Sequence, residues 1–241
     1  MKKLIRIKKA KKVIFVGDTH GDLEASQKII KDYLKEGSKI VFLGDYVDRG
    51  PFSKENLDFL LEKKKKNPKQ IFLLQGNHEG YPIFKFFPSE FWKSLKKKEY
   101  QNYSAIVKDF PLAVIVKNII ALHGALPEVK KLEDFEKIKL GDKNWFKICW
   151  GDFLNKDGDY LGSDPFTGRP QFGKDYFLRI MKKFKKEVLI RSHQPDSPQF
   201  MFDDKCLTIF TSSAYARERT VAILDFKEKI KSAKNLKIVK I

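Results

Sequence analysis

Short apolar runs alternate with amphipathic stretches along the first 80 residues. The runs Val13–Val16, Ile40–Leu43 and Gln70–Leu74 have the length and the bulky side chains of buried strands. A helix is predicted over residues 22–36, where apolar side chains recur every three or four positions. A second is predicted over residues 53–64, where Ser53 can cap the start and Asn67-Pro68 breaks the helix. This strand–helix alternation predicts right-handed crossovers and a mainly parallel sheet.

Beyond residue 80 the pattern is less regular. Residues 81–110 are rich in Phe and Lys and predict a helical insertion that covers one side of the sheet. Leu112–Val116 and Ile119–Leu122 predict a hairpin, and the Gly, Asp and Pro content of residues 151–172 predicts a long loop. A helix is expected over residues 173–186. Further strands are expected at Val188–Ile190, Cys206–Phe210, Thr220–Phe226 and Leu236–Ile241.

The chain shows no internal linker and no repeat, so residues 1–241 are predicted to form one α/β domain, two-layered or sandwiched. No run of 18 uncharged apolar residues is present, and no membrane span is expected. The basic N-terminus lacks the apolar stretch of a secretory signal. Cys149 and Cys206 have no metal or redox spacing, which predicts reduced core thiols in a cytoplasmic protein.

Charge is the strongest compositional signal. The net charge is +18, and lysines cluster at residues 2–12, 63–66, 96–98 and 182–186. Such a surface attracts anionic partners, such as phosphorylated substrates or RNA, but a lysine-rich solvated surface would look the same. The aromatic residues do not interleave with the lysines as a base-stacking platform would, which favours the solvated surface.

Polar residues follow five of the apolar runs. They are Gly17-Asp18-Thr19-His20-Gly21, Gly44-Asp45, Gly76-Asn77-His78-Glu79, His123-Gly124 and His193. All four histidines of the chain lie just after such a run or within two residues of its end. A lone histidine beside a core strand is usually structural, but four of them beside Asp and Asn indicate a metal site. The ends of the strands in an open α/β sheet are where ligands bind.

The types of ligand narrow the choice of metal. Asp, His and Asn without a thiolate suit Mn, Fe or Zn and are too rich in nitrogen for Ca or Mg. The set exceeds what one tetrahedral ion takes, whereas two ions that share a bridging carboxylate fit it. Paired metals about 3.5–4 Å apart serve in-line displacement at phosphorus. The sequence therefore predicts a hydrolase of phosphate esters.

These motifs also carry a family resemblance. In chain order, GDTHG (17–21), GDYVDRG (44–50), GNHE (76–79), LHG (122–124) and RSHQ (191–194) resemble the signature series of the PPP-family protein serine/threonine phosphatases. That family lies within the calcineurin-like metallophosphoesterases, and the chain is similar to a minimal prokaryotic-type catalytic domain. The resemblance implies an α/β fold with a central β-sandwich of mixed sheets flanked by helices.

The resemblance further implies the chemistry and the roles of the residues. Phosphoserine and phosphothreonine would be hydrolysed by direct attack of a hydroxide held between two metal ions, with phosphotyrosine a lesser substrate. Mn²⁺ is expected, and Fe or Zn stays open. The implied metal ligands are Asp18, His20, Asp45 (shared by both ions), Asn77, His123 and His193. His78 would be the general acid, oriented by Asp48, while Arg49 and Asn77 would hold phosphate oxygens.

Three positions depart from the family pattern. A second phosphate-binding arginine is expected within residues 151–172, and Arg169 is the only arginine there, although Pro170 stands where the family has Gly. WGDF (150–153) lacks the Pro of the family's Trp-Ser-Asp-Pro. TSSAY (211–215) only loosely resembles the stretch that overhangs the site in eukaryotic members, which leaves Tyr215 as a candidate pocket residue.

Other phosphatase chemistries do not fit. Neither cysteine is followed by an arginine six residues later, and no P-loop or Gly-x-Ser-x-Gly elbow is present. A dinucleoside polyphosphate or a capped RNA end remains an alternative substrate, which the net charge favours and the Asp48-Arg49 pair disfavours. A non-catalytic binding module is a further alternative, opposed by the intact ligand set. Phosphorylated proteins or peptides are the expected partners, whereas nucleic acid and regulatory subunits stay open.

Overall fold

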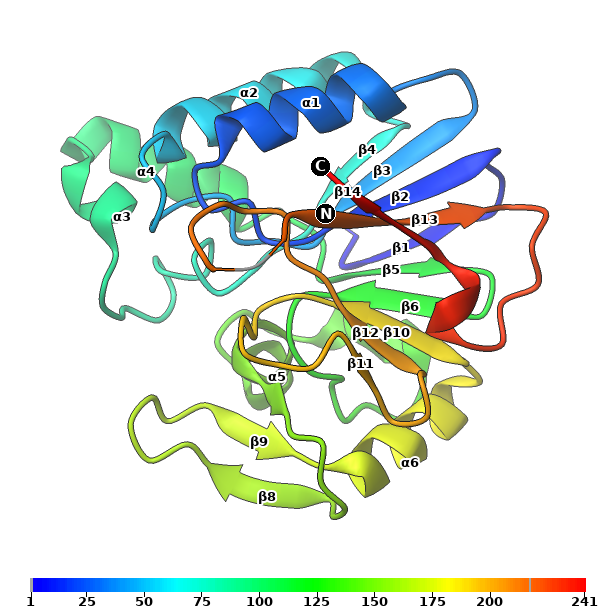
Figure 1. Cartoon of the computed structure of the whole chain (residues 1–241). Helices are drawn as coiled ribbons and strands as arrows, with labels where there is room; N and C mark the ends of the chain where they lie inside the picture. The colour runs from blue at the N-terminus through cyan, green and yellow to red at the C-terminus, as the bar shows by residue number, and fades with distance from the viewer. Residues whose placement is uncertain (1, 217) are drawn as a thin grey trace.

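Two β-sheets pack face to face between two layers of helices in the computed structural model, which describes residues 2–216 and 218–241 (Figure 1). The five-stranded sheet has the order β14-β13-β2-β3-β4, formed by Lys237–Lys240, Thr220–Asp225, Lys12–Val16, Ser38–Phe42 and Ile71–Leu73. The six-stranded sheet has the order β1-β5-β6-β10-β12-β11, formed by Leu4–Ile7, Ala113–Val116, Ile119–Leu122, Val188–Arg191, Cys206–Thr208 and Phe200–Met201.

The five-stranded sheet begins with the predicted strand–helix units. β2, β3 and β4 are parallel, and the helices α1 (Leu23–Tyr33) and α2 (Ser53–Lys66) form the crossovers. The side chain of Asp22 caps α1 by accepting from the N–H of Ala25, which satisfies one of the free donors of the first turn. β13 then pairs antiparallel with β2, and β14 with β13, so the sheet is mixed.

The six-stranded sheet contains the predicted hairpin, β5–β6, which turns at Lys117 with a left-handed φ of 52°. β10 lies parallel to β6, β12 lies parallel to β10, and β11 closes the edge antiparallel to β12. β1 pairs parallel with β5 and was not predicted. β1 has only four residues, and lysines flank it on both sides. Its alternation of apolar and polar residues is therefore too short to be recognised as a strand.

Three apolar layers hold the fold together. Between the sheets, side chains such as Phe15 and Val41 meet Val114 and Ile190 from the opposite sheet. The outer face of the five-stranded sheet is covered by α1, α2 and the predicted insertion, which forms α3 (Glu90–Ser94) and α4 (Lys97–Val107). The helices α5 (Lys143–Trp150) and α6 (Lys174–Phe184) cover the six-stranded sheet. The predicted fold, a mixed-sheet sandwich flanked by helices, is confirmed.

The prediction of a long loop over residues 151–172 was wrong. The segment forms a small sheet with the order β7-β9-β8, which comprises Asp152–Phe153, Pro170–Phe172 and Tyr160–Ser163. Strands this short cannot show a period of two, and most of β8 and β9 is half-buried or exposed. Phe153 and Phe172 anchor the sheet to the core below α6. The helix α5 and the 3₁₀ turns η1 (Leu132–Lys137) and η2 (Ala233–Asn235) were also not predicted.

Two compositional predictions also have an outcome in the structure. Cys149 and Cys206 are buried free thiols, as expected. Within the described residues, no helix has both the length and the apolar character that a membrane crossing requires.

Candidate active site

The loops that follow β2, β3, β4, β6 and β10 meet at one edge of the two sheets. They bring together the predicted residues Asp18, His20, Asp45, Asp48, Asn77, His78, His123 and His193, and all of these are buried. The first three loops come from the five-stranded sheet and the last two from the six-stranded sheet. The site therefore depends on the packing of one sheet against the other.

The backbone at this edge is strained. His20, Asp45, Asp48, Arg49 and His193 all adopt positive φ, between 41° and 73°. A left-handed conformation costs a residue other than glycine on the order of 1–3 kcal/mol, and it persists only where the surroundings impose it. Such a concentration of strain is typical of sites where the direction of a side chain matters more than local stability.

Glycine is required at one point between these loops. A Cβ atom on Gly76 would lie 2.2 Å from Oδ1 of Asp45, which is less than any real contact. The loop after β4 can therefore approach the Asp45 carboxylate only with glycine at this position.

Asp45 lies at the centre of two groups of candidate ligands. One group is His20, Asp45 and His78, and the other is Asp45, His123 and His193; within each group the ligand atoms lie within 4.8 Å of one another. Oδ2 of Asp45 is 3.6 Å from Nε2 of His20 and 3.4 Å from Nε2 of His123. Asp45 belongs to both groups, so its carboxylate could contribute to either.

The ring nitrogens of two histidines are oriented by backbone carbonyls. Nδ1 of His20 donates to the carbonyl of Val47 at 2.8 Å, and Nδ1 of His123 donates to that of Leu43 at 3.1 Å. In each ring Nε2 therefore faces the Asp45 carboxylate, which is the usual outer-shell arrangement of metal-binding histidine. Burial and the charge of His78 lower the pKa of His20 to about 4, which keeps its ring neutral.

The site has an excess of buried negative charge. Neither carboxylate oxygen of Asp18 has a hydrogen-bond partner, although the side chain is buried. Burial raises the pKa of Asp18 to about 7. Burial alone would lower the pKa of His123, but Asp45 and Asp18 outweigh it and raise the pKa to about 9. Both shifts mean that protonation, which adds positive charge, is favoured at this site. Bound metal cations would supply the same positive charge.

The second group is completed by Asn77 and His193. Oδ1 of Asn77 lies 3.0 Å from Nε2 of His123, and Nδ1 of His193 lies 3.1 Å from the same nitrogen. Together with Oδ2 of Asp45, these atoms converge on one point. Two nitrogens, an amide oxygen and a carboxylate oxygen form a donor set that suits a first-row transition metal.

His78 makes a different set of contacts. Its Nδ1 is 2.6 Å from Oδ2 of Asp48, whose other oxygen accepts the N–H of Phe91 at 2.7 Å. The indole of Trp92 donates to the carbonyl of His78, so the first turn of α3 holds the pair. Burial alone would lower the pKa of His78, but Asp45 and Asp48 raise it above the usual value. The ring is therefore stabilised in its protonated form.

Glu79 is a residue to which the sequence analysis gave no role. Its carboxylate accepts the backbone N–H groups of Asp45, Tyr46 and Gly76 at 2.8, 2.9 and 3.0 Å. It thereby ties the loop after β3 to the loop after β4. The only signal in the sequence was its place in the GNHE motif, and the hydrogen bonds from Asp45 and Tyr46 span more than 30 residues of chain.

The remaining predicted residues surround the site. The hydroxyl of Tyr215 is 3.3 Å from Nε2 of His20. The charge of Arg49 acts on the same hydroxyl and opposes the rise that burial causes in the pKa of Tyr215. Arg49 is exposed. The guanidinium of Arg169 lies 5.7 Å from the ring centre of Trp150, and with burial its charge lowers the pKa of His193. Both arginines thus lie beside the candidate ligands without being among them.

Comparison with known proteins agrees with this geometry. Residues 11–197 match the model of the calcineurin-like phosphoesterase family, to which the chain belongs. The chain is 29% identical to a "Probable serine/threonine-protein phosphatase" of Encephalitozoon cuniculi over 84% of its length, and 29% identical to a protein phosphatase 2A catalytic subunit of Dictyostelium discoideum over 90%. The predicted resemblance to PPP-family phosphatases is confirmed.

The chain covers different shares of these two relatives. The chain spans 47% of the Encephalitozoon protein and 74% of the Dictyostelium protein. Among solved structures, a serine/threonine phosphatase of Saccharomyces cerevisiae superposes with a TM-score of 0.84 at 24% identity, covering 99% of this chain and 83% of the other. At that identity the likeness supports the fold.

Proposed function

We propose that the chain is a metal-dependent protein phosphatase that hydrolyses phosphoserine and phosphothreonine. The observation that carries this proposal is the position of Asp45, which belongs to two groups of candidate ligands and lies next to the His78–Asp48 pair. The names of the curated relatives support the same activity. Because ligands come from both sheets, we propose that residues 1–241 act as one catalytic domain.

The residues present fit a pair of metal ions. The unpartnered oxygens of buried Asp18 are the direct test, because such a carboxylate is costly to bury without a cation. Asp18, His20 and Asp45 would hold the first ion. Asn77, His123 and His193 would hold the second, with Asp45 shared. When bound, the two ions would lower the pKa of a water molecule and neutralise the phosphate.

Residues of the chain would supply the other requirements of the reaction. A serine alkoxide leaves poorly without a proton, and His78, kept protonated by its neighbours, would donate that proton from Nε2 while Asp48 holds Nδ1. Arg49 and Arg169 would bind the phosphate oxygens, since guanidinium groups match phosphate geometry. Asn77 would assist them, and Tyr215 would line the entrance beside His20.

The proposed metal, cellular location and partners rest on the chemistry of the side chains rather than on the fold. Mn²⁺ suits the mixed oxygen and nitrogen donors, with Fe or Zn as alternatives. Two buried free thiols fit a reducing compartment, so we propose a cytoplasmic location. The proposed partners are phosphorylated proteins or peptides.

A panel of substrates tests the proposal. Phosphate release is measured with Mn²⁺ from a phosphoserine peptide, a phosphotyrosine peptide, diadenosine tetraphosphate and a capped RNA. We expect the highest kcat/KM for the phosphoserine peptide. A preference for diadenosine tetraphosphate or capped RNA would replace the proposal by the alternative phosphohydrolase, and binding of phosphopeptide without turnover of any substrate would make the chain a binding module.

A further inference from the structure

Six short segments far apart in the sequence form a strongly basic surface. They are residues 8–12, 31–39, 62–69, 117, 185–187 and 225–234, together called the basic end. They contain 19 of the 49 Lys and Arg residues but only 6 of the 31 Asp and Glu residues. The basic end therefore carries +13 of the net charge of +18, and the rest of the chain carries +5.

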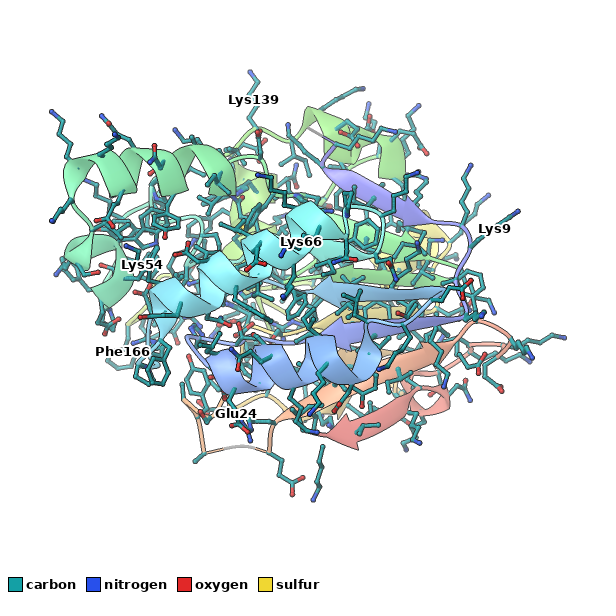
Figure 2. All side chains as sticks on the ribbon, turned by 90° about the horizontal axis from the view of Figure 1, so that it is seen from above. Lys9, Glu24, Lys54, Lys66, Lys139 and Phe166 are labelled. Atoms are coloured by element: carbon teal, nitrogen blue, oxygen red, sulfur yellow. The ribbon has the colours of Figure 1, made fainter. Side chains whose placement is uncertain are left out.

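The topology explains why these segments meet. β2, β3 and β10 begin at the basic end, and α1, α2 and α6 finish there. The candidate active site follows the opposite ends of the same strands. Figure 2 shows Lys9 projecting from one side of the molecule, whereas Lys54 and Phe166 lie at the other.

Hydrogen bonds join the segments into one continuous surface. The N–H of Lys11 donates to Gly37 at 2.6 Å, and the carbonyl of Lys11 accepts the N–H of Phe226 at 3.0 Å. The other links are Lys39 to Lys69, Gln70 to Lys35, Lys117 to Phe226, Lys186 to Lys117 and Glu187 to Asn118. The cluster at residues 63–66 and parts of the clusters at residues 2–12 and 182–186 thus come together in space.

Most of these lysines are exposed and without an acidic partner. Fifteen of the 19 are exposed. Of these 19 lysines, all within the described part of the chain, only Lys63, Lys66 and Lys234 have a carboxylate oxygen of a described residue within 4.0 Å. Cations at helix C-termini are locally favourable, which accounts for lysines in the last turns of α1 and α2. It does not account for Lys9 or Lys229, which lie in loops.

We propose that the basic end binds the phosphate backbone of double-stranded nucleic acid. Its cations are all lysines, which act as point charges towards phosphate and lack the planar fork that reads bases. The exposed large apolar side chains of the described chain all lie elsewhere: Phe52, Phe84, Phe87, Ile106, Tyr160, Phe166 and Leu178. The surface therefore offers no side chain to insert into a bilayer and no platform for unpaired bases.

Binding at this end leaves the candidate active site free. The enzyme would act on phosphoproteins attached to the same nucleic acid while remaining bound to it. Binding at this second surface does not depend on the identity of the substrate; only the choice of phosphoproteins rests on the proposed function.

Fluorescence anisotropy with a labelled duplex of about 20 base pairs tests the proposal between about 50 and 200 mM KCl. We expect the affinity to fall steeply with salt. The test variant is K9E/K31E/K65E/K229E, all exposed positions of the basic end. The matched control is K97E/K98E/K130E/K139E, which changes the net charge equally at exposed positions outside it.

The test variant should bind at least about tenfold more weakly, with a log–log salt slope shallower by about three to four, whereas the control should keep most of its affinity. The corresponding Lys→Gln variant should show the same order if the reversals disturb folding. Saturating duplex should leave hydrolysis of an aryl phosphate unchanged.

Four results would overturn the proposal: equal losses in both variants, tighter binding to polyglutamate, tighter binding to phosphatidylserine vesicles, or competitive inhibition of the aryl phosphatase activity by the duplex. Each would assign the charge to another partner or to another part of the surface. A failure of the substrate panel leaves this test intact, because anisotropy reports binding alone.

Discussion

The strands β2, β3 and β10 begin at the basic end and finish at the candidate active site. The charged side chains at these two ends differ in burial and in the partners they have. At the site the carboxylates and histidines are buried, and several of them lie in left-handed backbone and are oriented by hydrogen bonds. At the basic end the lysines are mostly exposed and mostly without acidic neighbours. A buried charge is costly without a partner, so its position is fixed by the groups around it. A solvated lysine contributes chiefly to the net charge of the surface. A single substitution at the site should therefore have a large effect on activity that depends on the residue. At the basic end, single substitutions should have small effects on the affinity for nucleic acid, and these effects should add.

The largest effect is expected from Asp45→Asn. An amide bridges two cations poorly, so both ions should bind weakly and turnover should fall by about a thousandfold or more. Metal content by mass spectrometry and kcat for a phosphoserine peptide measure the two losses. Asp109→Asn is the control, because Asp109 is exposed and outside the site. Loss of a single ion with activity largely retained would contradict the bridging role.

His78→Asn should separate metal binding from proton donation. We expect phosphoserine turnover to fall by about 10²–10⁴-fold, with a smaller loss for an activated aryl phosphate, which needs no proton on its leaving group. Metal content should stay that of the wild type. Since His78 also lies in one of the two candidate ligand groups, loss of one ion would instead make it a ligand.

Glu79→Gln should weaken the site from outside the ligand set. Its amide keeps one acceptor oxygen where the carboxylate accepts three N–H groups, so the loops that carry Asp45 and Gly76 are held less firmly. We expect metal affinity to fall by about 10–100-fold, as for other outer-shell partners. Titration calorimetry with Mn²⁺ measures the change. Unchanged affinity would make the contact purely structural.

Asp48→Asn should shift the pH profile. Asp48 helps to raise the pKa of His78, and the acid form of His78 is the active one. Activity should therefore fall as the pH rises through this pKa, and without the carboxylate the fall should begin at a lower pH. The pH dependence of kcat/KM for a phosphoserine peptide reports the shift. An alkaline limb that stays in place, or moves to higher pH, would contradict the role of Asp48.

The smallest effect is expected at the basic end. The variant K9E/K31E/K65E/K229E should hydrolyse an aryl phosphate within about twofold of the wild-type rate, because its changes lie in exposed, solvent-screened positions. A steady-state assay at physiological salt is sufficient. A large loss of kcat would show that the basic end and the candidate active site are coupled, which would contradict their independence.

The sequence predicted which residues would come together better than it predicted the surrounding strands. Asp18, Asp45 and His193 each follow a continuous run of three or four apolar residues, so their convergence at the ends of strands could be inferred. β1 and β7–β9 could not be inferred, because they are too short to show a period of two and, unlike β5, β6 and β10, do not form continuous apolar runs.

Contacts across the chain were equally hidden from sequence. The hydrogen bonds of Glu79 and the joining of the lysine clusters into the basic end depend on which loops become neighbours. Only the topology of the two sheets provides that information.

Anomalous diffraction from crystals grown with Mn²⁺ tests the central claim most directly. Two peaks should appear about 3.5–4 Å apart, with the Asp45 carboxylate between them, Asp18 and His20 on one ion, and Asn77, His123 and His193 on the other. His78 should remain bound to Asp48, outside both coordination spheres. A single peak, or an ion coordinated by His78 in place of Asp18, would contradict the account.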